Sequence, residues 1–260
     1  MDRHAQTIRN MFSSVASRYD LLNHLLSLDL DRRWRRKAAA VAFNGRTPAL
    51  VLDLCAGTGD MALALARQCD GAKIIALDFA RPMLERARAK INEAGLADRL
   101  VAICGDALRL PFADHSFDLL TVAFGLRNVS PIEAALREAA RVVRPGGQMV
   151  ILEFALPPRG LWRRLYGFYF FHILPMIGRW ISGTSAYAYL AESVALFPQP
   201  DGFRQLLAEH GFVNAQWRPL ACGAVALHTA SVACVSDRAP DQPAQVRRCG
   251  APCCQGSVAR

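Results

Sequence analysis

Short apolar runs alternate with longer amphipathic segments from residue 49 onward. The runs typical of buried strands are residues 50–54, 73–78, 100–104, 117–124 and 148–154. Apolar positions at helical spacing lie between them, in residues 61–68, 82–93 and 131–143. Strands that are buried on both faces and separated by helices are typical of a parallel, doubly wound α/β sheet.

The last third of the chain adds three further elements to this pattern. A helix is expected near residues 202–210, and strand-like runs follow at 213–220 and 224–235. We therefore predict a mostly parallel, seven-stranded sheet whose last two strands form a hairpin.

Other segments lie outside the alternation. Helical spacing over residues 10–43 predicts an N-terminal helical cap, with bounds 1–45, ahead of a main domain at 46–235. An aromatic insertion interrupts that domain at about residues 156–198. Residues 236–260 are rich in Pro, Gln, Arg and small side chains, so we expect a disordered tail.

Composition is compatible with one sizeable core, because 52% of the 260 residues are hydrophobic. Lys and Arg number 31 against 22 acidic residues, which gives a formal charge of +9. A basic surface favours nucleic acid or an anionic membrane. An Ala- and Arg-rich composition raises the charge without any such partner, and the basic run at residues 31–37 also resembles a solvated helix face. Both interpretations stay open.

The sequence predicts a cytoplasmic protein, with peripheral contact at the inner face of the membrane as an open alternative. No signal peptide is visible. The longest apolar run, residues 165–178, contains Pro175 and is shorter than the roughly 20 residues that span a bilayer. Cys55, Cys69 and Cys104 fall in or beside α/β core elements as ordinary free thiols, which indicates a reducing compartment. The cysteines of the tail lack the partners of a metal site, so we expect no metal.

A glycine-containing segment, Asp53 to Asp60 (DLCAGTGD), connects the first strand to the next helix. Gly57, Thr58 and Gly59 lie at the carboxyl end of that strand, where open α/β sheets bind ligands. The glycines let the backbone approach an anionic group at the helix N-terminus. We expect them to bind the methionine carboxylate of S-adenosylmethionine.

Acidic residues stand at the ends of three successive strands. Asp53 precedes the glycines by four residues, where it can orient the loop and an ammonium group of the cofactor. Asp78 ends the second strand about 20 residues past the glycines, a spacing at which a carboxylate accepts both hydroxyls of an adenosine ribose. Asp106, which follows Gly105, and the backbone amide of Ala107 are placed to bind the adenine ring. An isolated Asp is more often a turn or cap residue, but the joint placement favours a cofactor site.

The glycines also fit a dinucleotide pattern, since Gly57, Gly59 and Ala62 satisfy G-x-G-x-x-A. A single match of that kind is weak. The acidic residue before the glycines, the adenine-binding pair and the turn at residues 145–147 favour the methyl donor instead. We therefore predict the Rossmann-like fold of class I S-adenosylmethionine-dependent methyltransferases.

The segment after the fourth strand should face the methyl acceptor. It reads AFGLRN over residues 123–128, with neither the Pro-Pro-aromatic loop of many amine methyltransferases nor the cysteine of cytosine C-methylation. Arg127 and Asn128 suggest an oxygen-bearing, partly anionic substrate. We expect Ala123, at the start of the segment, to lie against the cofactor.

Several stretches together form a specific set of motifs. They are RYDLLN at 18–23 with Trp34, DLCAGTGD at 53–60, LPF at 110–112, FGLRN at 124–128, RVVRPGG at 141–147 leading into LEF at 152–154, and SAY at 185–187 before FP at 197–198. This set resembles the ubiquinone/menaquinone biosynthesis C-methyltransferase family. The resemblance covers roughly residues 8–230 and leaves the tail unexplained.

The resemblance implies transfer of a methyl group to a ring carbon of a polyprenylated quinol, either a benzoquinol or demethylmenaquinol. A hydroquinol carbon becomes nucleophilic when the neighbouring hydroxyl loses its proton, so the protein must mainly align the reactants and stabilise a phenolate. We assign phenolate stabilisation to Arg127 and orientation of the quinol oxygen to Asn128. Tyr19 resembles the family's lid residue over the cofactor.

The proton acceptor is left open by the sequence. His172, Tyr187 and Glu153 are candidates, although a packing or capping role is more common for each of these residue types. The family more often carries a glycine and a histidine where this chain has Asp29-Leu30-Asp31. If that histidine touches substrate, the quinol accepted here differs from the family's usual ones.

The aromatic insertion suits a lipid-like substrate. Phe168 to Phe171 and the flanking arginines are expected to line a passage for the prenyl tail or to rest at a membrane interface, while a cap helix packed on its own core is the alternative. A methyltransferase acting on RNA through residues 31–37 is a second functional hypothesis, although we expect no nucleic acid partner, and a cofactor-binding scaffold is a third. The sequence leaves the oligomeric state open, a homodimer included.

Overall fold

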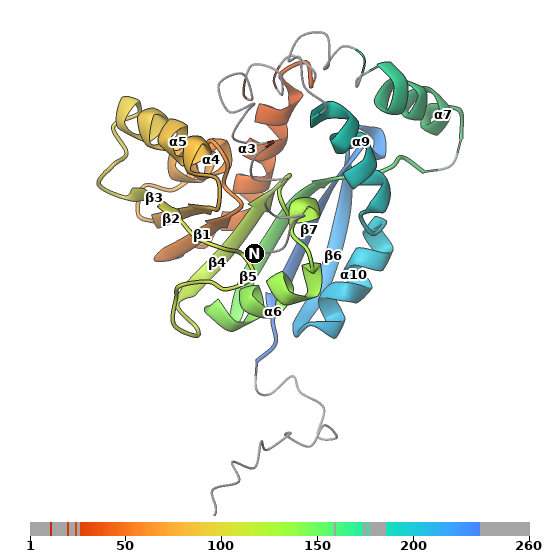
Figure 1. Ribbon diagram of the computed structural model, residues 1–260. Helices are drawn as coiled ribbons and strands as arrows, with labels where there is room; N and C mark the ends of the chain where they lie inside the picture. The colour runs from red at the N-terminus through yellow and green to blue at the C-terminus, as the bar shows by residue number, and fades with distance from the viewer. Residues whose placement is uncertain are drawn as a thin grey trace, which may run out of the picture.

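Seven strands form one sheet in the order β3-β2-β1-β4-β5-β7-β6 (Figure 1). The computed structural model describes Met11, Asp20, His24 and residues 27–158, 160–173, 176 and 186–234. The strands are β1 (Leu50–Leu54), β2 (Lys73–Asp78), β3 (Leu100–Cys104), β4 (Phe117–Ala123), β5 (Val143–Phe154), β6 (Phe212–Leu220) and β7 (Val225–Val232). The first five pair in parallel, and β7 is antiparallel to both neighbours. The predicted sheet with its late hairpin is confirmed.

Helices cover both faces of the sheet (Figure 1). One face carries α3 (Leu30–Phe43), α4 (Asp60–Gln68) and α5 (Arg81–Glu93), and the other carries α6 (Ile132–Val142) and α10 (Pro200–Glu209). Successive strand residues point to opposite faces, so Val51 of β1 packs with the first layer and Leu52 with the second. Burial on both faces explains why the strands read as continuous apolar runs.

The start of β5 differs from the sequence prediction. The strand begins at Val143, so the expected turn at residues 145–147 lies inside it, and the register between β4 and β5 breaks between Phe117 and Leu119. A Cβ on Gly147 would lie 2.8 Å from the Arg144 oxygen and 3.1 Å from a second backbone oxygen, that of Asp118. Glycine permits this close backbone approach, which hydrophobic spacing cannot reveal. β7 ends at Val232, before the expected limit of residue 235.

The predicted aromatic insertion consists of α7 (Leu161–Phe168), η2 (Tyr169–Ile173) and α9 (Ala186–Leu196) in its described parts. These helices lie beyond the carboxyl end of β5 (Figure 1). No helix in the described ranges is both long and apolar enough to cross a membrane. Cys55, Cys69 and Cys104 are free thiols, as expected.

The two ends of the chain are described only in part. Helix α3 lies in the C-terminal part of the segment expected to be a helical cap, and it packs in the same core as α4 and α5. Most residues before Ser27, and the tail predicted to be disordered at 236–260, lie outside the described residues.

Candidate active site

A cavity opens where the carboxyl ends of β1, β2, β3 and β4 meet. Its lining includes these residues predicted from the sequence: Asp53, Gly57, Thr58, Asp78, Asp106, Ala107, Ala123 and Asn128. Parallel strands bring their carboxyl ends to one edge of the sheet, so residues far apart in the chain gather there. Gly59 and Arg127 do not contribute to the lining, and Tyr19 lies outside the described residues.

The glycine loop is fastened to the end of β2. Gly57 and Gly59 have positive φ angles of 56° and 83°, a region that glycine adopts without steric cost. The Gly57 amide donates to Asp78 Oδ2 at 2.8 Å, and the Ala56 amide donates to the Leu77 oxygen at 3.0 Å. Helix α4 then begins at Asp60, so its N-terminal turn faces the cavity rim.

Asp78 holds the loop through both carboxylate oxygens. Oδ1 accepts from the Ala80 amide at 2.9 Å while Oδ2 accepts from Gly57. The side chain is buried, and burial raises its pKa, which the backbone donors partly counteract. Each oxygen keeps acceptor capacity towards the cavity, since a carboxylate offers about four lone-pair sites.

Asp53 is the less satisfied of the two buried carboxylates. Its residue is 0% exposed, and Oδ1 accepts from the Thr121 hydroxyl at 2.8 Å. Oδ2 has no hydrogen-bond partner among the described residues. Burial raises the pKa of Asp53 to about 7, although the Thr121 hydrogen bond, the Arg35 charge and the nearby Ala62 backbone amide oppose this change. A buried acceptor without a donor destabilises the folded protein. A hydrogen-bond donor of a ligand at this oxygen would remove that cost and so favour ligand binding.

Asp106 has a local partner as well as a position on the cavity. Its Oδ1 accepts from the Leu108 amide at 2.9 Å, which is the turn geometry common for isolated Asp residues. The side chain nevertheless lies on the cavity beside Ala107. Turn formation and adenine binding are thus compatible at this residue.

The FGLRN segment packs against the end of β1. A Cβ on Gly125 would lie 2.4 Å from the Cβ of Cys55, so glycine is required for this contact. The segment continues as the short helix η1 (Leu126–Asn128). Asn128 lines the cavity, and its buried Oδ1 has no hydrogen-bond partner among the described residues. This oxygen is therefore an unsatisfied acceptor on a residue of the cavity lining.

Arg127 points away from the cavity and forms a buried ion pair. Its Nη1 lies 2.7 Å from Glu153 Oε1 and donates to the Phe124 oxygen at 2.5 Å. The side chains of Arg127 and Glu153 are 6% and 1% exposed. Glu153 Oε2 also accepts from the Arg127 amide at 3.4 Å, so the pair fastens η1 to the end of β5. Direct stabilisation of a phenolate by Arg127 would require the guanidinium to leave this pair, and Glu153 is not free to act as a proton acceptor.

Of the other two candidate proton acceptors, His172 does not line the cavity. His172 is exposed, and its ring stacks on Phe168 at 5.3 Å. Tyr187 falls in α9, but its side chain lies outside the described ones. The identity of the proton acceptor stays a prediction.

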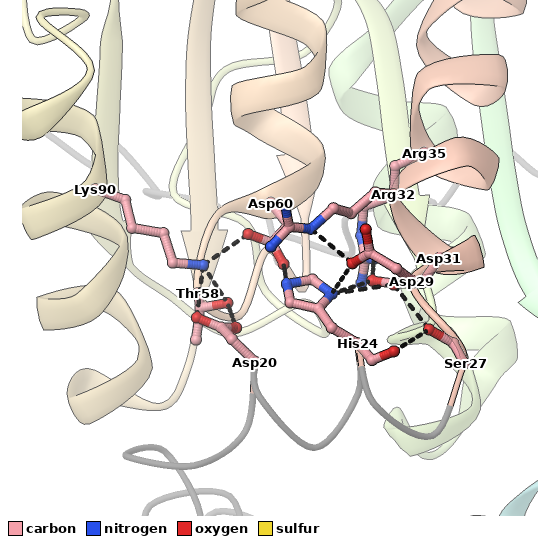
Figure 2. Close-up of polar contacts among 10 residues, drawn as sticks. All are labelled: Asp20, His24, Ser27, Asp29, Asp31, Arg32, Arg35, Thr58, Asp60 and Lys90. Carbon is pink, nitrogen blue, oxygen red and sulfur yellow. Dashed lines mark hydrogen bonds and ion pairs between the residues drawn. The ribbon is translucent and has the colours of Figure 1, made fainter.

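An N-terminal residue closes over the glycine loop through a polar network that the sequence did not reveal (Figure 2). Asp20 Oδ1 accepts from the Thr58 hydroxyl at 2.5 Å. Lys90 of α5 lies 2.7 Å from Asp20 and 2.6 Å from Asp60. His24 Nε2 lies 3.8 Å from the same Asp60. The network ties the N-terminal segment, α4 and α5 together around Thr58.

Arg35 of α3 is a cavity residue that sequence reasoning missed. It lies in the basic run 31–37, where the solvated-face interpretation holds for four exposed basic residues but is wrong for Asp31 and Arg35. Arg35 forms an ion pair with Asp31, lines the cavity and lies with its guanidinium 5.3 Å from the Phe124 ring centre. The i,i+4 spacing of the pair, on the face that carries Ala38, Ala39 and Ala42, is the signal that could have found it.

Asp31 belongs to the Asp29-Leu30-Asp31 stretch, at which the resemblance leads us to expect a glycine and a histidine. Burial opposes its ionisation, but the Arg35 charge and hydrogen bonds from His24 and Ser27 hold the pKa of Asp31 below its ordinary value. His24 Nδ1 lies 2.9 Å from Asp31 Oδ2 (Figure 2). Asp31 does not line the cavity, so in the described structure this departure changes a buried polar cluster.

Solved structures identify the class of fold. The crystal structure of the [4+2]-cyclase SpnF covers 88% of this chain and 97% of its own, with a TM-score of 0.63 and 18% identity. A putative S-adenosylmethionine-dependent methyltransferase from Methanococcus maripaludis covers 85% of this chain and 93% of its own, with a TM-score of 0.60 and 21% identity. The fold is that of class I S-adenosylmethionine-dependent methyltransferases, and likeness at this identity establishes no activity.

Sequence relatives identify the family. Residues 1–232 match the ubiE/COQ5 methyltransferase family. Demethylmenaquinone methyltransferase from Thermus thermophilus is 47% identical over 219 residues, which cover 84% of this chain and 98% of that protein. The ubiquinone/menaquinone biosynthesis C-methyltransferase UbiE of Geotalea daltonii is 43% identical over 231 residues, covering 86% and 95%. The chain belongs to the ubiE/COQ5 methyltransferase family, which confirms the resemblance.

The buried Arg127–Glu153 pair yields a prediction about stability. Glu153→Gln leaves the Arg127 charge buried without its counter-ion, so we expect the free energy of unfolding to fall by about 3 kcal/mol. Adding Arg127→Met to this variant removes the isolated charge and should restore most of the loss. Urea denaturation measures both changes. Asp70→Asn, which breaks a pair whose carboxylate is 97% exposed, is the matched control and should have little effect. Equal losses in all three proteins would contradict the structural role of the buried pair.

Proposed function

We propose that this protein transfers a methyl group from S-adenosylmethionine to a ring carbon of a reduced, polyprenylated quinol. The observation that carries the proposal is a pair of buried acceptors, Asp53 Oδ2 and Asn128 Oδ1, which have no hydrogen-bond partner among the described residues and belong to residues that line the same cavity. One polar group suits the cationic end of the donor, and the other suits a hydroxyl of the acceptor. Membership of the ubiE/COQ5 family and the names of its two relatives support this pairing of donor and acceptor.

The residues on the strand ends fit the methyl donor. Asp53 Oδ2 would accept from its ammonium group, and the remaining acceptor capacity of Asp78 would take the ribose hydroxyls. Arg35 is a buried cation on the lining whose charge acts on Asp53, and we assign it to the donor's carboxylate together with the N-terminal turn of α4. Asp106 and Ala107 would bind the adenine ring. Asp20 accepts a hydrogen bond from Thr58 and would stand beside the glycine loop at this end of the cavity.

The acceptor side depends on the FGLRN segment. When S-adenosylmethionine is bound, its sulfonium supplies an electrophilic methyl group, whose bond to sulfur breaks as the bond to the quinol carbon forms. Asn128 would accept a hydrogen bond from a quinol hydroxyl and so fix the ring's orientation. Phe124 and Val129 supply an apolar wall. The Arg127–Glu153 pair holds this segment in place.

Turnover with reduced and oxidised acceptors tests the proposed reaction. Purified protein with labelled S-adenosylmethionine should methylate a reduced demethylmenaquinol or a benzoquinol and give little product with the oxidised quinones, because the ring carbon is nucleophilic only in the quinol. Failure on every reduced quinol, in protein that binds the donor, would refute the proposal. Methylation of RNA together with salt-sensitive RNA binding would instead support the RNA hypothesis.

Asn128 gives this assay a residue-level prediction. Asn128→Leu removes the acceptor's orienting group, so we expect kcat to fall about 10²-fold while the Kd for the donor stays within a factor of about two. Asn92→Leu, on the exposed face of α5, is the control and should leave kcat unchanged. A kcat for Asn128→Leu near that of the unaltered protein would exclude an orienting role.

Asp53 predicts a pH dependence of donor binding. With a pKa of about 7, Asp53 is mostly protonated at pH 5.5 and must lose its proton to bind an ammonium group. The affinity for S-adenosylmethionine should therefore rise roughly tenfold between pH 5.5 and 7.0. The contribution of Asp53 to folding stability changes with pH in the opposite direction to donor affinity. Its pKa in the folded state lies above the unfolded value of 3.8, so its contribution to the free energy of unfolding falls as the pH rises from about 4 to 7. Calorimetric titration across this range measures the affinity. Asp53→Asn should bind weakly with a flat pH profile, and an equally steep profile in that variant would show that another group titrates.

A further inference from the structure

Large apolar side chains are exposed on one part of the insertion. Five of the nine large hydrophobic residues that are exposed in the described structure lie within residues 161–171. They are Leu161 at 73%, Trp162 at 48%, Leu165 at 57%, Phe168 at 60% and Phe171 at 37% exposed. Leu161, Leu165 and Phe168 have i, i+4 and i+7 spacing, so they form one outward face of α7. Patches of this kind mark interaction sites in folded proteins.

The inward face is what attaches this segment to the rest of the fold. Tyr166 stacks on Phe170 at 5.3 Å, and Phe170 is buried against Ala191 and Val194 of α9. Figure 1 shows α7 at the margin of the molecule, past the carboxyl end of β5. The outward apolar face is therefore not required for packing on the described core.

The charged residues in the stretch of sequence around the patch have a single sign. No acidic residue occurs between Glu153 and Glu192, whereas the same stretch contains four arginines. Two of them, Arg163 and Arg164, are exposed on α7 itself. A short helix with Leu, Trp and Phe on one face and arginines beside it is suited to the interface of an anionic lipid bilayer.

Aromatic rings connect the patch to the cavity. Phe124 of the cavity lining lies 4.6 Å from Phe154, measured between ring centres. Phe154 lies 6.0 Å from Phe170, which contacts Tyr166, and Tyr166 lies 6.3 Å from the exposed Trp162. This row of rings forms a continuous apolar connection from the acceptor side of the cavity to the outward face of the insertion.

We propose that α7 and η2 form a docking surface for an anionic phospholipid membrane, with Leu161, Trp162, Leu165, Phe168 and Phe171 inserted at the interface and Arg163 and Arg164 on the headgroups. One part of this proposal rests on the proposed function, namely that a polyprenylated quinol resides in the bilayer and reaches the cavity along the aromatic row. Binding to lipid itself is a property of this surface, and it is measurable without turnover.

Flotation with vesicles tests the docking surface. The unaltered protein should float with vesicles of phosphatidylcholine containing phosphatidylglycerol, more weakly with phosphatidylcholine alone, and less in 0.5 M NaCl because salt screens the arginines. The double variant Leu165→Ser/Phe168→Ser should lower partitioning at least about tenfold, since each side chain loses its apolar insertion. Arg163→Gln/Arg164→Gln should weaken binding to the anionic vesicles alone. Val101→Thr, which alters an apolar residue that is 52% exposed on β3, is the control and should float normally.

Two further measurements keep the result interpretable. Tryptophan emission should shift to the blue on adding anionic vesicles, and Trp162→Phe should remove the shift. Turnover of a quinol with a short, water-soluble tail should be unaffected by Leu165→Ser/Phe168→Ser, whereas turnover of a long-tailed quinol in vesicles should fall. Normal flotation of that double variant would overturn the docking surface, and so would a dimer that the variant dissociates in the absence of any vesicle binding. Vesicle binding without methylation of any quinol would refute the proposed reaction and leave the docking surface standing.

Discussion

The carboxylates of Asp53 and Asp78 are buried side by side at the carboxyl ends of parallel strands, and the rest of the site is arranged around them. Pairing of β1 with β4 sets Asp53 opposite Thr121, the residue that donates its hydrogen bond. Two backbone amides donate hydrogen bonds to the Asp78 carboxylate and so offset the cost of burying it. One of them is the Gly57 amide, so this hydrogen bond also fixes the conformation of the glycine loop. In Asp53, Oδ1 accepts a hydrogen bond from Thr121, whereas Oδ2 has no donor at hydrogen-bond distance among the described residues. Because burying a carboxylate is costly unless donors surround it, the open oxygen is where a cationic group of a ligand gains most.

On the methyl-acceptor side of the cavity, the cost of burying charge is offset in a different way. Arg127 and Glu153 are both buried, but each neutralises the other, so the pair fixes the FGLRN segment without presenting a free charge. Asn128, next in the chain, is then the polar group offered to a substrate. The apolar row from Phe124 to the insertion continues from this side. The polar end of the cavity suits the charged methyl donor, and the apolar end suits the lipid-like ring of the methyl acceptor.

The sequence predicts the parts of this arrangement that depend on local pattern. Strands β1, β2 and β3 have the expected limits. Polar or glycine residues mark the limits of two of them: β2 runs from Lys73 to Asp78, and Arg99 and Gly105 flank β3. Asp53 and Asp78 could be placed because parallel strands end at one edge of the sheet. The orientation of Arg127 could not, since its partner Glu153 lies on another strand and the ion pair forms only in the folded chain. Arg35 was hidden among exposed basic residues of the same helix, and the early start of β5 follows from a backbone approach at Gly147.

The measurement that tests the central claim most directly is a crystal structure of the protein with S-adenosylhomocysteine bound. The account predicts that the ligand's ammonium group lies within hydrogen-bond distance of Asp53 Oδ2 and that its ribose hydroxyls contact the Asp78 carboxylate. It also predicts that the Arg127–Glu153 pair is intact in that complex. A ligand bound in this cavity with Asp53 Oδ2 still unpartnered, or a ligand bound elsewhere, would contradict the account.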